Sequence, residues 1–128
     1  MRISLTSVFV DDQEKARRFY TEQLGLQVDT DAPYGPDERW ITVVSPEEPG
    51  GIQLALHRRD QAAQDFQEAN RKVGRPVVSF VTDDCRRDYE QLRAKGVSFI
   101  SEPTEYPYGG TDAVFEDDCG NLLNLHQD

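Results

Sequence analysis

The chain has 128 residues, of which 37% are hydrophobic, and a formal net charge of −10 from 24 acidic and 14 basic side chains. The acidic balance excludes the usual nucleic-acid-binding protein, which neutralises phosphates with an excess of Lys and Arg. No apolar run approaches the ~20 residues that span a bilayer and no signal pattern opens the chain, so we expect no membrane partner and a cytoplasmic location.

The first part of the chain combines strand-like and helix-like patterns. Asp11 and Asp12 offer a helix N-cap, apolar residues then recur at helical spacing, and Gly25 is a helix stop. The expected strands are 3–10, 26–28, 39–45 and 52–57, with a proline-containing loop at 31–38. This order predicts one β-α-β-β-β unit.

A polar segment at 58–75 separates this unit from the remainder of the chain. Ala63, Phe66 and Ala69 recur there at helical spacing, and Gly74 follows as a stop. The spacing predicts a short connecting helix with these three residues on its packed side.

The last part of the chain repeats the first at a constant offset of 71 residues, as in Val10 and Val81 or Gly25 and Gly96. Asp83 is the expected cap of its helix, which runs to Lys95 and stops at Gly96. The expected strands are 77–81, 97–101, 112–116 and 122–126, with a loop at 102–110. We therefore predict an α+β domain of two tandem β-α-β-β-β units, 1–57 and 76–128, joined by 58–75. Their curved mixed sheets should form a cleft, with the helices on the outer face.

The period of two along a strand separates the two faces of each sheet. In the fourth strand, Ile52, Leu54 and Leu56 belong on the helix side, so Gln53 and His57 face away. The final strand repeats this arrangement with Asn124 and His126 facing away from the helices. The constant offset makes Gln53 and Asn124 structural equivalents at the floor of the predicted cleft.

Several of these residues resemble the motifs of a known superfamily. The segments are Val10-Asp-Asp12, Ala16, Phe19-Tyr20, Leu24-Gly25 and Cys119-Gly-Asn-Leu-Leu-Asn-Leu125. Together they resemble the vicinal-oxygen-chelate superfamily, which includes glyoxalase I, fosfomycin- and bleomycin-resistance proteins, and extradiol dioxygenases. The resemblance spans nearly the whole chain and implies the paired β-α-β-β-β fold. It says little about the reaction, because one fold carries many functions.

The metal positions of that superfamily fall here at Leu5, Gln53, Pro76 and Asn124. Leu5 and Pro76 offer no ligand atom, and the two amides are neutral and poor substitutes for imidazole or carboxylate. We therefore expect no metal at these four positions and no cofactor.

The only two histidines, His57 and His126, are the candidates for other chemistry on the polar face. They form either an alternative metal pair or an acid/base near pH 7, or else they are strand-end residues that face solvent. No carboxylate shares the polar face of their own strands, and the sequence leaves open whether Glu102 and Glu105 of the loop approach them.

Other candidate ligand-binding residues are of three kinds. Gln53 and Asn124 either orient a ligand or face water. Tyr106 and Tyr108 are the expected aromatic walls, whereas Trp40 is expected in the core because its strand is aliphatic. Arg39 either pairs with an anionic ligand or is an ordinary exposed strand arginine.

The function that these features favour is metal-free binding or sequestration of a small molecule, similar to the bleomycin-resistance branch. The alternative is an enzyme of lyase, isomerase or dioxygenase type that uses His57 or His126 as base or as atypical metal ligands. A third alternative is an accessory domain that only dimerises. We expect a homodimer because the sheets have edges that pairing would cover. Cys85 and Cys119 are expected to be reduced thiols.

Overall fold

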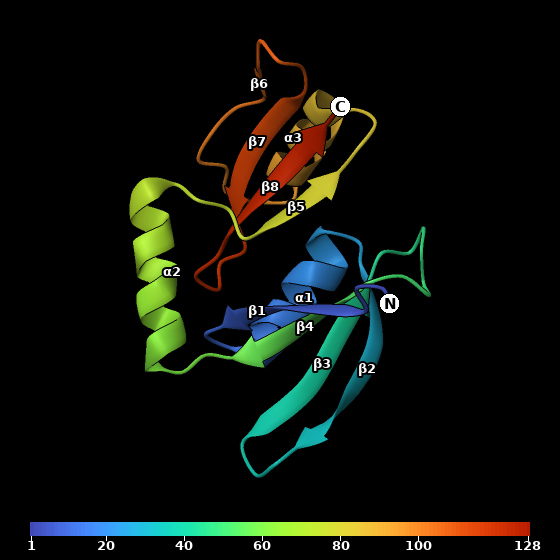
Figure 1. The fold of residues 1–128 in the computed structure, drawn as a ribbon, viewed down its shortest axis with the longest axis vertical. Coiled ribbons are helices and arrows are strands. Elements are labelled where there is room, and N and C mark those ends of the chain that lie inside the picture. The colour runs from blue at the N-terminus through green and yellow to red at the C-terminus, as the bar shows by residue number, and fades with distance from the viewer.

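The computed structural model describes all 128 residues as two four-stranded sheets with their helices (Figure 1). The first unit comprises β1 (Leu5–Val10), α1 (Gln13–Arg18), the π-helical turn η1 (Phe19–Gln23), β2 (Gln27–Tyr34), β3 (Glu38–Val44) and β4 (Gln53–Arg58). The helix α2 (Gln61–Val73) leads to β5 (Val78–Val81), α3 (Cys85–Ala94), β6 (Thr104–Glu105), β7 (Thr111–Glu116) and β8 (Leu122–Gln127). None of the helices is long and apolar enough to cross a membrane.

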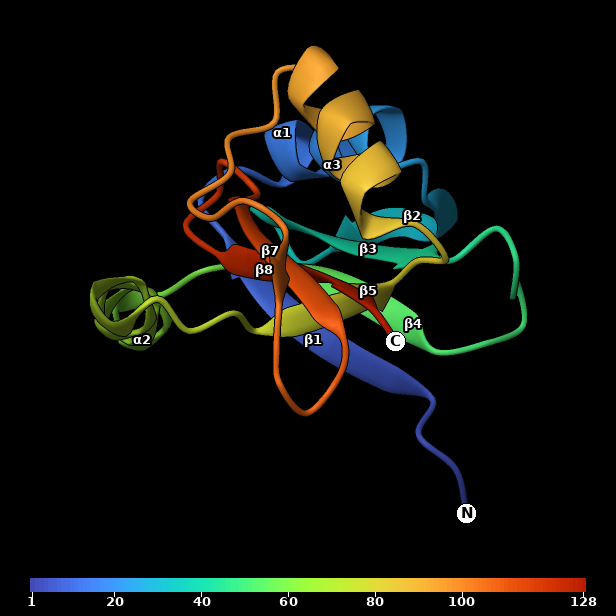
Figure 2. The same ribbon diagram turned by 90° about the horizontal axis from the view of Figure 1, so that it is seen from above.

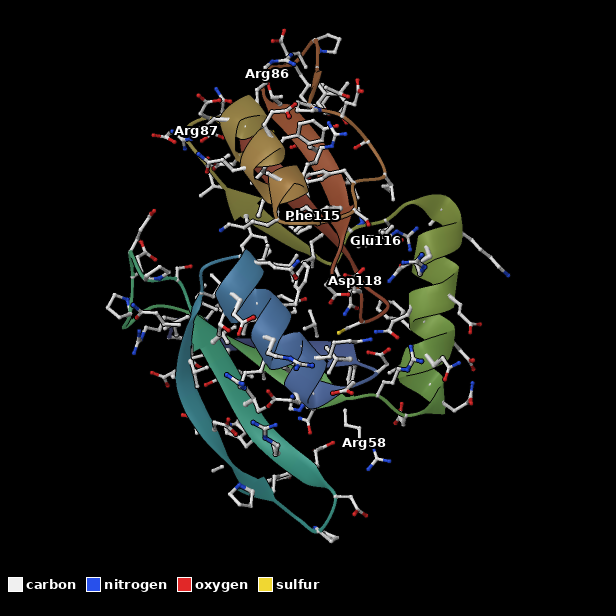
Figure 3. The ribbon with its side chains drawn as sticks, turned by 180° about the vertical axis from the view of Figure 1, so that it is seen from behind. Arg58, Arg86, Arg87, Phe115, Glu116 and Asp118 are labelled. Atoms are coloured by element: carbon white, nitrogen blue, oxygen red, sulfur yellow. The ribbon has the colours of Figure 1, made fainter.

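Both sheets have the same topology. Their strand orders are β1-β4-β3-β2 and β5-β8-β7-β6. In each sheet the first and fourth strands of the unit are parallel and the other neighbours are antiparallel. The helices α1 and α3 lie on the same side of the two sheets (Figures 2 and 3). The predicted α+β class with two tandem units and mixed sheets is therefore confirmed.

One hydrophobic core joins the two units. A cluster of 17 buried residues includes Val10, Tyr20 and Ile41 from the first unit and Phe115 and Leu123 from the second. Burial of this apolar surface is the main stabilising contribution to such a fold. Because the cluster is continuous, the two units form one packed body.

A buried polar network crosses the boundary between the units. The carboxylate of Asp117, fully buried after β7, accepts hydrogen bonds from Tyr20 Oη (2.7 Å), Asn121 Nδ2 (2.7 Å), and the backbone N–H groups of Cys119 (2.8 Å) and Asn121 (2.9 Å). Asn121 Nδ2 also donates to the carbonyl of Phe9 at the end of β1 (2.7 Å). Burial raises the pKa of Asp117, and the donors oppose this shift.

Gly120 lies where α2 approaches the turn between β7 and β8. Its φ is +105°, which side-chain-bearing residues rarely adopt, and a Cβ atom there would stand 2.7 Å from Gln67 Oε1. Gln67 Nε2 in turn donates to Phe9 O (2.7 Å) and Asn121 Oδ1 (3.1 Å). Glycine at this position therefore lets the connecting helix dock on both units.

The predictions of two loops and one strand are wrong in part. The strand β2 continues to Tyr34, through the region predicted as loop, because Pro33 lies on an edge strand where a missing N–H is tolerated. The predicted strand at 97–101 is reduced to a single bridge between Phe99 and Phe115. The short strand β6 forms instead within the predicted loop.

Two helix predictions also need correction. The N-cap of α3 is Asp84, whose side chain accepts from the N–H of Arg87, and not Asp83. In α2 the buried residues are Ala63, Gln67 and Asn70, whereas Phe66 is 56% exposed. The inner side of α2 is polar because it faces the backbone carbonyls and amides of the network around Asn121, not an apolar sheet.

Candidate functional site

The face of each sheet opposite α1 and α3 is the candidate site, and we call it the open face (Figures 1 and 3). In the first unit it carries Ser7, Phe9, Tyr34, Trp40, Thr42, Gln53, Ala55 and His57. In the second unit it carries Ser79, Val81, Asp112, Val114, Asn124 and His126. These positions alternate along each strand with the residues that contact the helices, as period-two geometry requires. Thr42 and Ala55, at the centre of the first sheet, are nevertheless fully buried.

An aromatic row crosses the open face of the first unit, from β2 through β3 and β4 to β1. Its members are Tyr34, Trp40, His57 and Phe9, and successive ring centroids are 6.0, 5.3 and 5.9 Å apart. His57 Nε2 is also 3.1 Å from Ser7 Oγ. Trp40 is half-buried on this face and not in the core as expected, because its neighbours Ile41 and Val43 take the helix side. The row presents flat rings at the distances typical of aromatic contacts.

A polar row occupies the corresponding place in the second unit. His126 Nδ1 lies 2.6 Å from Asp112 Oδ1, and His126 Nε2 lies 3.0 Å from Asp128 Oδ1. Asn124 Nδ2 donates to Ser79 Oγ and to Asp112 Oδ1, both at 3.2 Å. The carboxylates beside His126 are thus Asp112 and Asp128, and neither Glu102 nor Glu105 of the loop pairs with it. Asp112 was missed because it lies on the neighbouring strand, although the hairpin of β7 and β8 places it opposite His126.

These two carboxylates change the protonation of His126. The hydrogen bond to Asp112, and then that to Asp128, raise the pKa of His126 above its ordinary value of 6.5, because both favour the imidazolium. The half-buried Asp112 holds the ring at Nδ1. At Nε2 the partner is Asp128, which is highly exposed, so this nitrogen lies toward solvent.

We expect the pH dependence of stability to reveal this pair. The pKa of His126 is higher in the folded state than in the unfolded state, where it is near 6.5. The pair therefore stabilises the folded state fully below pH 6.5, and this stabilisation is lost as the pH rises through the pKa of the folded state. The destabilisation caused by Asp112→Asn should therefore shrink from pH 6 to about pH 9. Imidazole NMR titration should also show a lower pKa for His126 in this variant. An unchanged pKa would contradict the pairing.

The strand register departs from the constant offset in the sequence. In the first sheet Gln53 pairs with Leu5, and Ala55 pairs with Ser7. In the second sheet Asn124 pairs with Ser79, which corresponds to Ser7, so Asn124 corresponds to Ala55. Gln53 and Asn124 are therefore not structural equivalents. The equivalents are His57 and His126, which pair with Phe9 and Val81. The reason is that the connection between β3 and β4 is three residues longer than that between β7 and β8.

The four positions where the superfamily holds its metal do not form a metal site in this chain. Leu5 and Gln53 are adjacent on the parallel strands, but only the amide has a donor atom. The amide nitrogen of Asn124 is engaged with Ser79 and Asp112. No set of three or more His, Cys, Asp or Glu side chains is arranged to hold a metal ion. The residues present therefore do not fit the metal chemistry of the superfamily.

The remaining predicted residues lie apart from these rows. Arg39 faces the helix side and pairs with Asp31 (2.7 Å) and Glu14 (2.9 Å), so its charge is neutralised there. Tyr106 and Tyr108 stack on each other with centroids 5.3 Å apart. Their turn ends at Gly110, where a Cβ atom would stand 3.0 Å from His126 Cε1. The turn therefore flanks the polar row.

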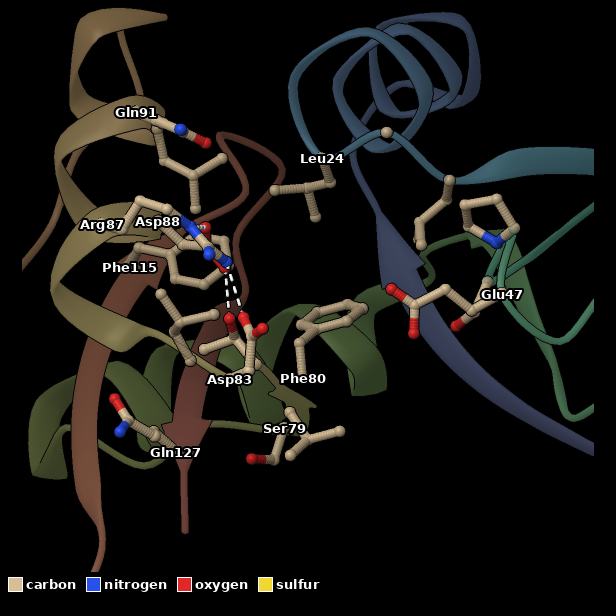
Figure 4. A pocket seen from close by; sticks show the side chains of 18 of the residues that line it. Leu24, Glu47, Ser79, Phe80, Asp83, Arg87, Asp88, Gln91, Phe115 and Gln127 are labelled. Atoms are coloured by element: carbon tan, nitrogen blue, oxygen red, sulfur yellow. Dashed lines mark hydrogen bonds and ion pairs between the residues drawn. The ribbon is translucent and has the colours of Figure 1, made fainter.

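A groove lies between the two units (Figure 4). It has a volume of about 1100 Å³ and includes Ser79 and Val81 of the open face, together with Asp128 of the polar row. The groove therefore borders the polar row of the second unit. The aromatic and polar rows remain the candidate site, because they carry the side chains that can select a ligand.

Comparison with known proteins agrees with this architecture. Residues 2–125 match the family model described as Glyoxalase/Bleomycin resistance protein/Dioxygenase superfamily. The chain belongs to this superfamily. Among curated relatives, the uncharacterized protein YurT of Bacillus subtilis (strain 168) is 42% identical over 128 residues, which cover 99% of both chains.

Two solved structures are similar over almost the whole chain. UcmS2 has 35% sequence identity and a TM-score of 0.83, covering 98% of this chain and 97% of that one. TnmS3, described as an antibiotic binding protein from Streptomyces sp. CB03234, has 30% identity and a TM-score of 0.78, covering 99% and 95%. These similarities establish the fold and the superfamily, within which ligands and reactions differ.

Proposed function

We propose that this chain binds or sequesters a small planar aromatic molecule on its open face, without a metal ion. The observation that carries the proposal is the aromatic row of Tyr34, Trp40, His57 and Phe9. Aromatic rings bury a large area and favour stacked or edge-on contacts with another ring system. A row of four such rings on a sheet face without a covering helix is suited to a flat ligand.

The charges around the site favour a neutral or cationic ligand. The net charge of the chain is −10, and Asp112 and Asp128 lie in the polar row. An anionic ligand would meet a repulsive field, whereas a cation would gain from the carboxylates and from the faces of the rings. The similar protein TnmS3 is described as an antibiotic binding protein, which supports a small-molecule role here.

We further propose that the chain acts as a homodimer. The strands β1 and β5 are edges of their sheets. Leu5 and Phe9 of β1 are more than a third exposed, and Val81 of β5 is 75% exposed. Unpaired edges with apolar side chains favour association, and a second copy covers them symmetrically.

A second candidate function is proton transfer, as in an isomerase or lyase. The specific observation is the 2.6 Å contact of Asp112 with His126 Nδ1, which orients the ring and leaves Nε2 facing only the exposed Asp128. Above its raised pKa the ring is neutral, and Nε2 can then act as a general base once Asp128 moves away. Turnover of a screened ligand, abolished by His126→Gln, would favour this candidate over sequestration.

The test of the proposed function uses 9-aminoacridine, a planar cationic probe, and protein treated with a chelator. We expect equal affinity before and after chelation. Gln53→Ala should weaken binding by roughly 1–3 kcal/mol, because a ligand group loses its amide partner, and its melting temperature should change little. Asn124→Ala tests whether the second amide also contacts the ligand or, through its hydrogen bonds to Ser79 and Asp112, only holds the polar row. Gln61→Ala, which removes an exposed amide from α2, is the control. Loss of binding on chelation would contradict the metal-free proposal, and normal binding with low melting temperatures would make these amides structural.

A further inference from the structure

The connecting helix α2 lies at one side of the molecule, and no other helix lies beside it (Figures 1 and 2). Its polar inner side docks on the body through Gln67. A second row of helical spacing lies on its exposed surface and is entirely apolar. We call this row the α2 stripe: Ala62, Phe66, Ala69 and Val73. Phe66 is 56% exposed and Val73 is 64% exposed. Apolar residues that recur at intervals of four and three residues are the pattern by which one helix packs on another.

The sizes of the side chains in the α2 stripe complement one another. In an antiparallel pair of stripes, Phe66 of one copy lies beside Ala69 of the other. Val73 of one copy then lies beside Ala62 of the other. Each large side chain meets a small one, which lets two helices interdigitate closely. A parallel pair would instead place Phe66 against Phe66 and leave a gap between facing alanines. The stripe therefore fits a second copy of itself in the antiparallel direction.

The charges beside the α2 stripe favour the same direction. Asp65 and Lys72 are exposed and flank the stripe on the side of the helix opposite Gln67. Neither takes part in an ion pair, and Asp65 accepts only a hydrogen bond from Gln61 (2.9 Å). An antiparallel pair brings Asp65 of each copy beside Lys72 of the other, as flanking charges do in coiled coils. A parallel pair would bring like charges together.

A membrane surface suits the α2 stripe less well than a second helix does. Helices that lie on membranes carry Lys and Arg along their polar side, where they meet anionic lipids. Here Asp65 and Glu68 lie beside the stripe, and the chain has a net charge of −10. Anionic lipids would therefore be repelled, whereas a second copy supplies both the apolar surface and the opposite charges.

We infer that two copies of this chain associate through their α2 helices, which pair antiparallel about a two-fold axis. This contact is distinct from the sheet edges of the proposed homodimer and from the aromatic and polar rows. Where dimers form through the sheet edges, pairing of α2 joins them into larger assemblies. A helix of 13 residues presents less surface than the roughly 800 Å² that each partner buries in a standard interface. The association is therefore weak and depends on concentration.

Site-directed cross-linking of the full chain tests the direction of pairing. Ala62→Cys and Val73→Cys are treated with a short bismaleimide at about 200 µM chain, since a small interface associates weakly. A mixture of the two variants should give several times more covalent pair than either variant alone, because residues 62 and 73 face each other. In either variant alone the new cysteines lie about 16 Å apart, which is the rise of eleven helical residues. The wild type is the background control, because Cys85 and Cys119 are buried.

Sedimentation velocity tests the apolar part of the contact. Phe66→Asp should raise the dissociation constant of the concentration-dependent step by more than about thirtyfold, because each contact loses two buried phenylalanine side chains. Ile100→Asp is the matched control, since Ile100 is 52% exposed and lies outside α2. It should leave the constant unchanged. Thermal melting should show both variants folded as the wild type.

Charge reversal tests whether the occupant is a second copy. Asp65→Lys and Lys72→Asp should each weaken the association by roughly fivefold, since two surface ion pairs become pairs of like charge. An equal mixture of the two variants should recover wild-type association, because both sides of the mixed contact then join opposite charges.

Four results would overturn the pairing of α2 and leave the proposed ligand site and the sheet-edge homodimer standing. One is a covalent pair that forms equally well with a single cysteine variant. Another is association that tolerates Phe66→Asp, or that Ile100→Asp weakens equally. The third is a charge-reversal mixture that fails to recover. The last is binding of a lipid vesicle or another protein at Phe66 by a chain that does not associate with itself.

Discussion

Replacement of Asp117 with alanine is expected to lower the free energy of unfolding by about 3–5 kcal/mol. The substitution leaves Tyr20 Oη, Asn121 Nδ2 and two backbone N–H groups without an acceptor in a site that water does not reach. It also separates η1, β1 and the turn after β7, which the network joins. Urea denaturation monitored by circular dichroism measures the change.

Two other variants show whether the effect belongs to the buried network. Tyr20→Phe removes a single donor and should cost only about 1–2 kcal/mol. Asp118→Asn makes the same change of charge as Asp117→Asn at the adjacent exposed residue, and asparagine tolerates its φ of +59°. We expect almost no effect from Asp118→Asn. Equal destabilisation by Asp117→Asn and Asp118→Asn would show that the loss is one of net charge and not of the network.

Binding of 9-aminoacridine is expected to quench the fluorescence of Trp40, and Trp40→Ala should weaken this binding by about 2 kcal/mol, or roughly thirtyfold. Trp40 is the single tryptophan of the chain, so its emission reports on the aromatic row alone. A ligand that stacks there removes the ring from solvent and loses its main contact surface when the ring is truncated. Titration calorimetry measures the affinity of the variants, which lack this fluorescence.

The control for this prediction is another exposed aromatic residue. Phe66 lies on α2, away from the open face, and Phe66→Ala should leave affinity unchanged. Trp40→Phe keeps a ring in the row and should retain most of the binding. Suppose that the probe quenches the wild-type fluorescence but Trp40→Ala binds it with unchanged affinity. The probe would then bind near the Trp40 ring but not on it.

The period-two and helical patterns of the sequence were sufficient to predict the units and the two faces of each sheet. Applied to β3, the period of two puts Trp40 on the face of the sheet away from Ile41 and Val43. The same rule therefore predicts that Trp40 lies on the open face and not in the core. The hairpin of β7 and β8 places Asp112 opposite His126 once its turn is known. These two site residues were therefore accessible to sequence reasoning, but only through strand register.

Other features depend on contacts that no local pattern encodes. The first unit has one more residue between its helix cap and the following glycine than the second unit has. The π-helical turn η1, in which the N–H of Leu24 donates to Phe19 O, accommodates this extra residue. The constant offset in the sequence does not show this insertion, so Asp83 was predicted as a cap instead of Asp84. Likewise, α2 buries Gln67 because it docks on carbonyl and amide groups from distant segments.

The most direct test of the account is a crystal structure of the chain in complex with 9-aminoacridine. The aromatic row predicts that the ring system lies against Trp40 and His57 on the open face of the first unit, with no metal ion between protein and ligand. Density for the probe in the groove beside Leu24 and Phe80, or at any site remote from Trp40, would contradict the proposed function.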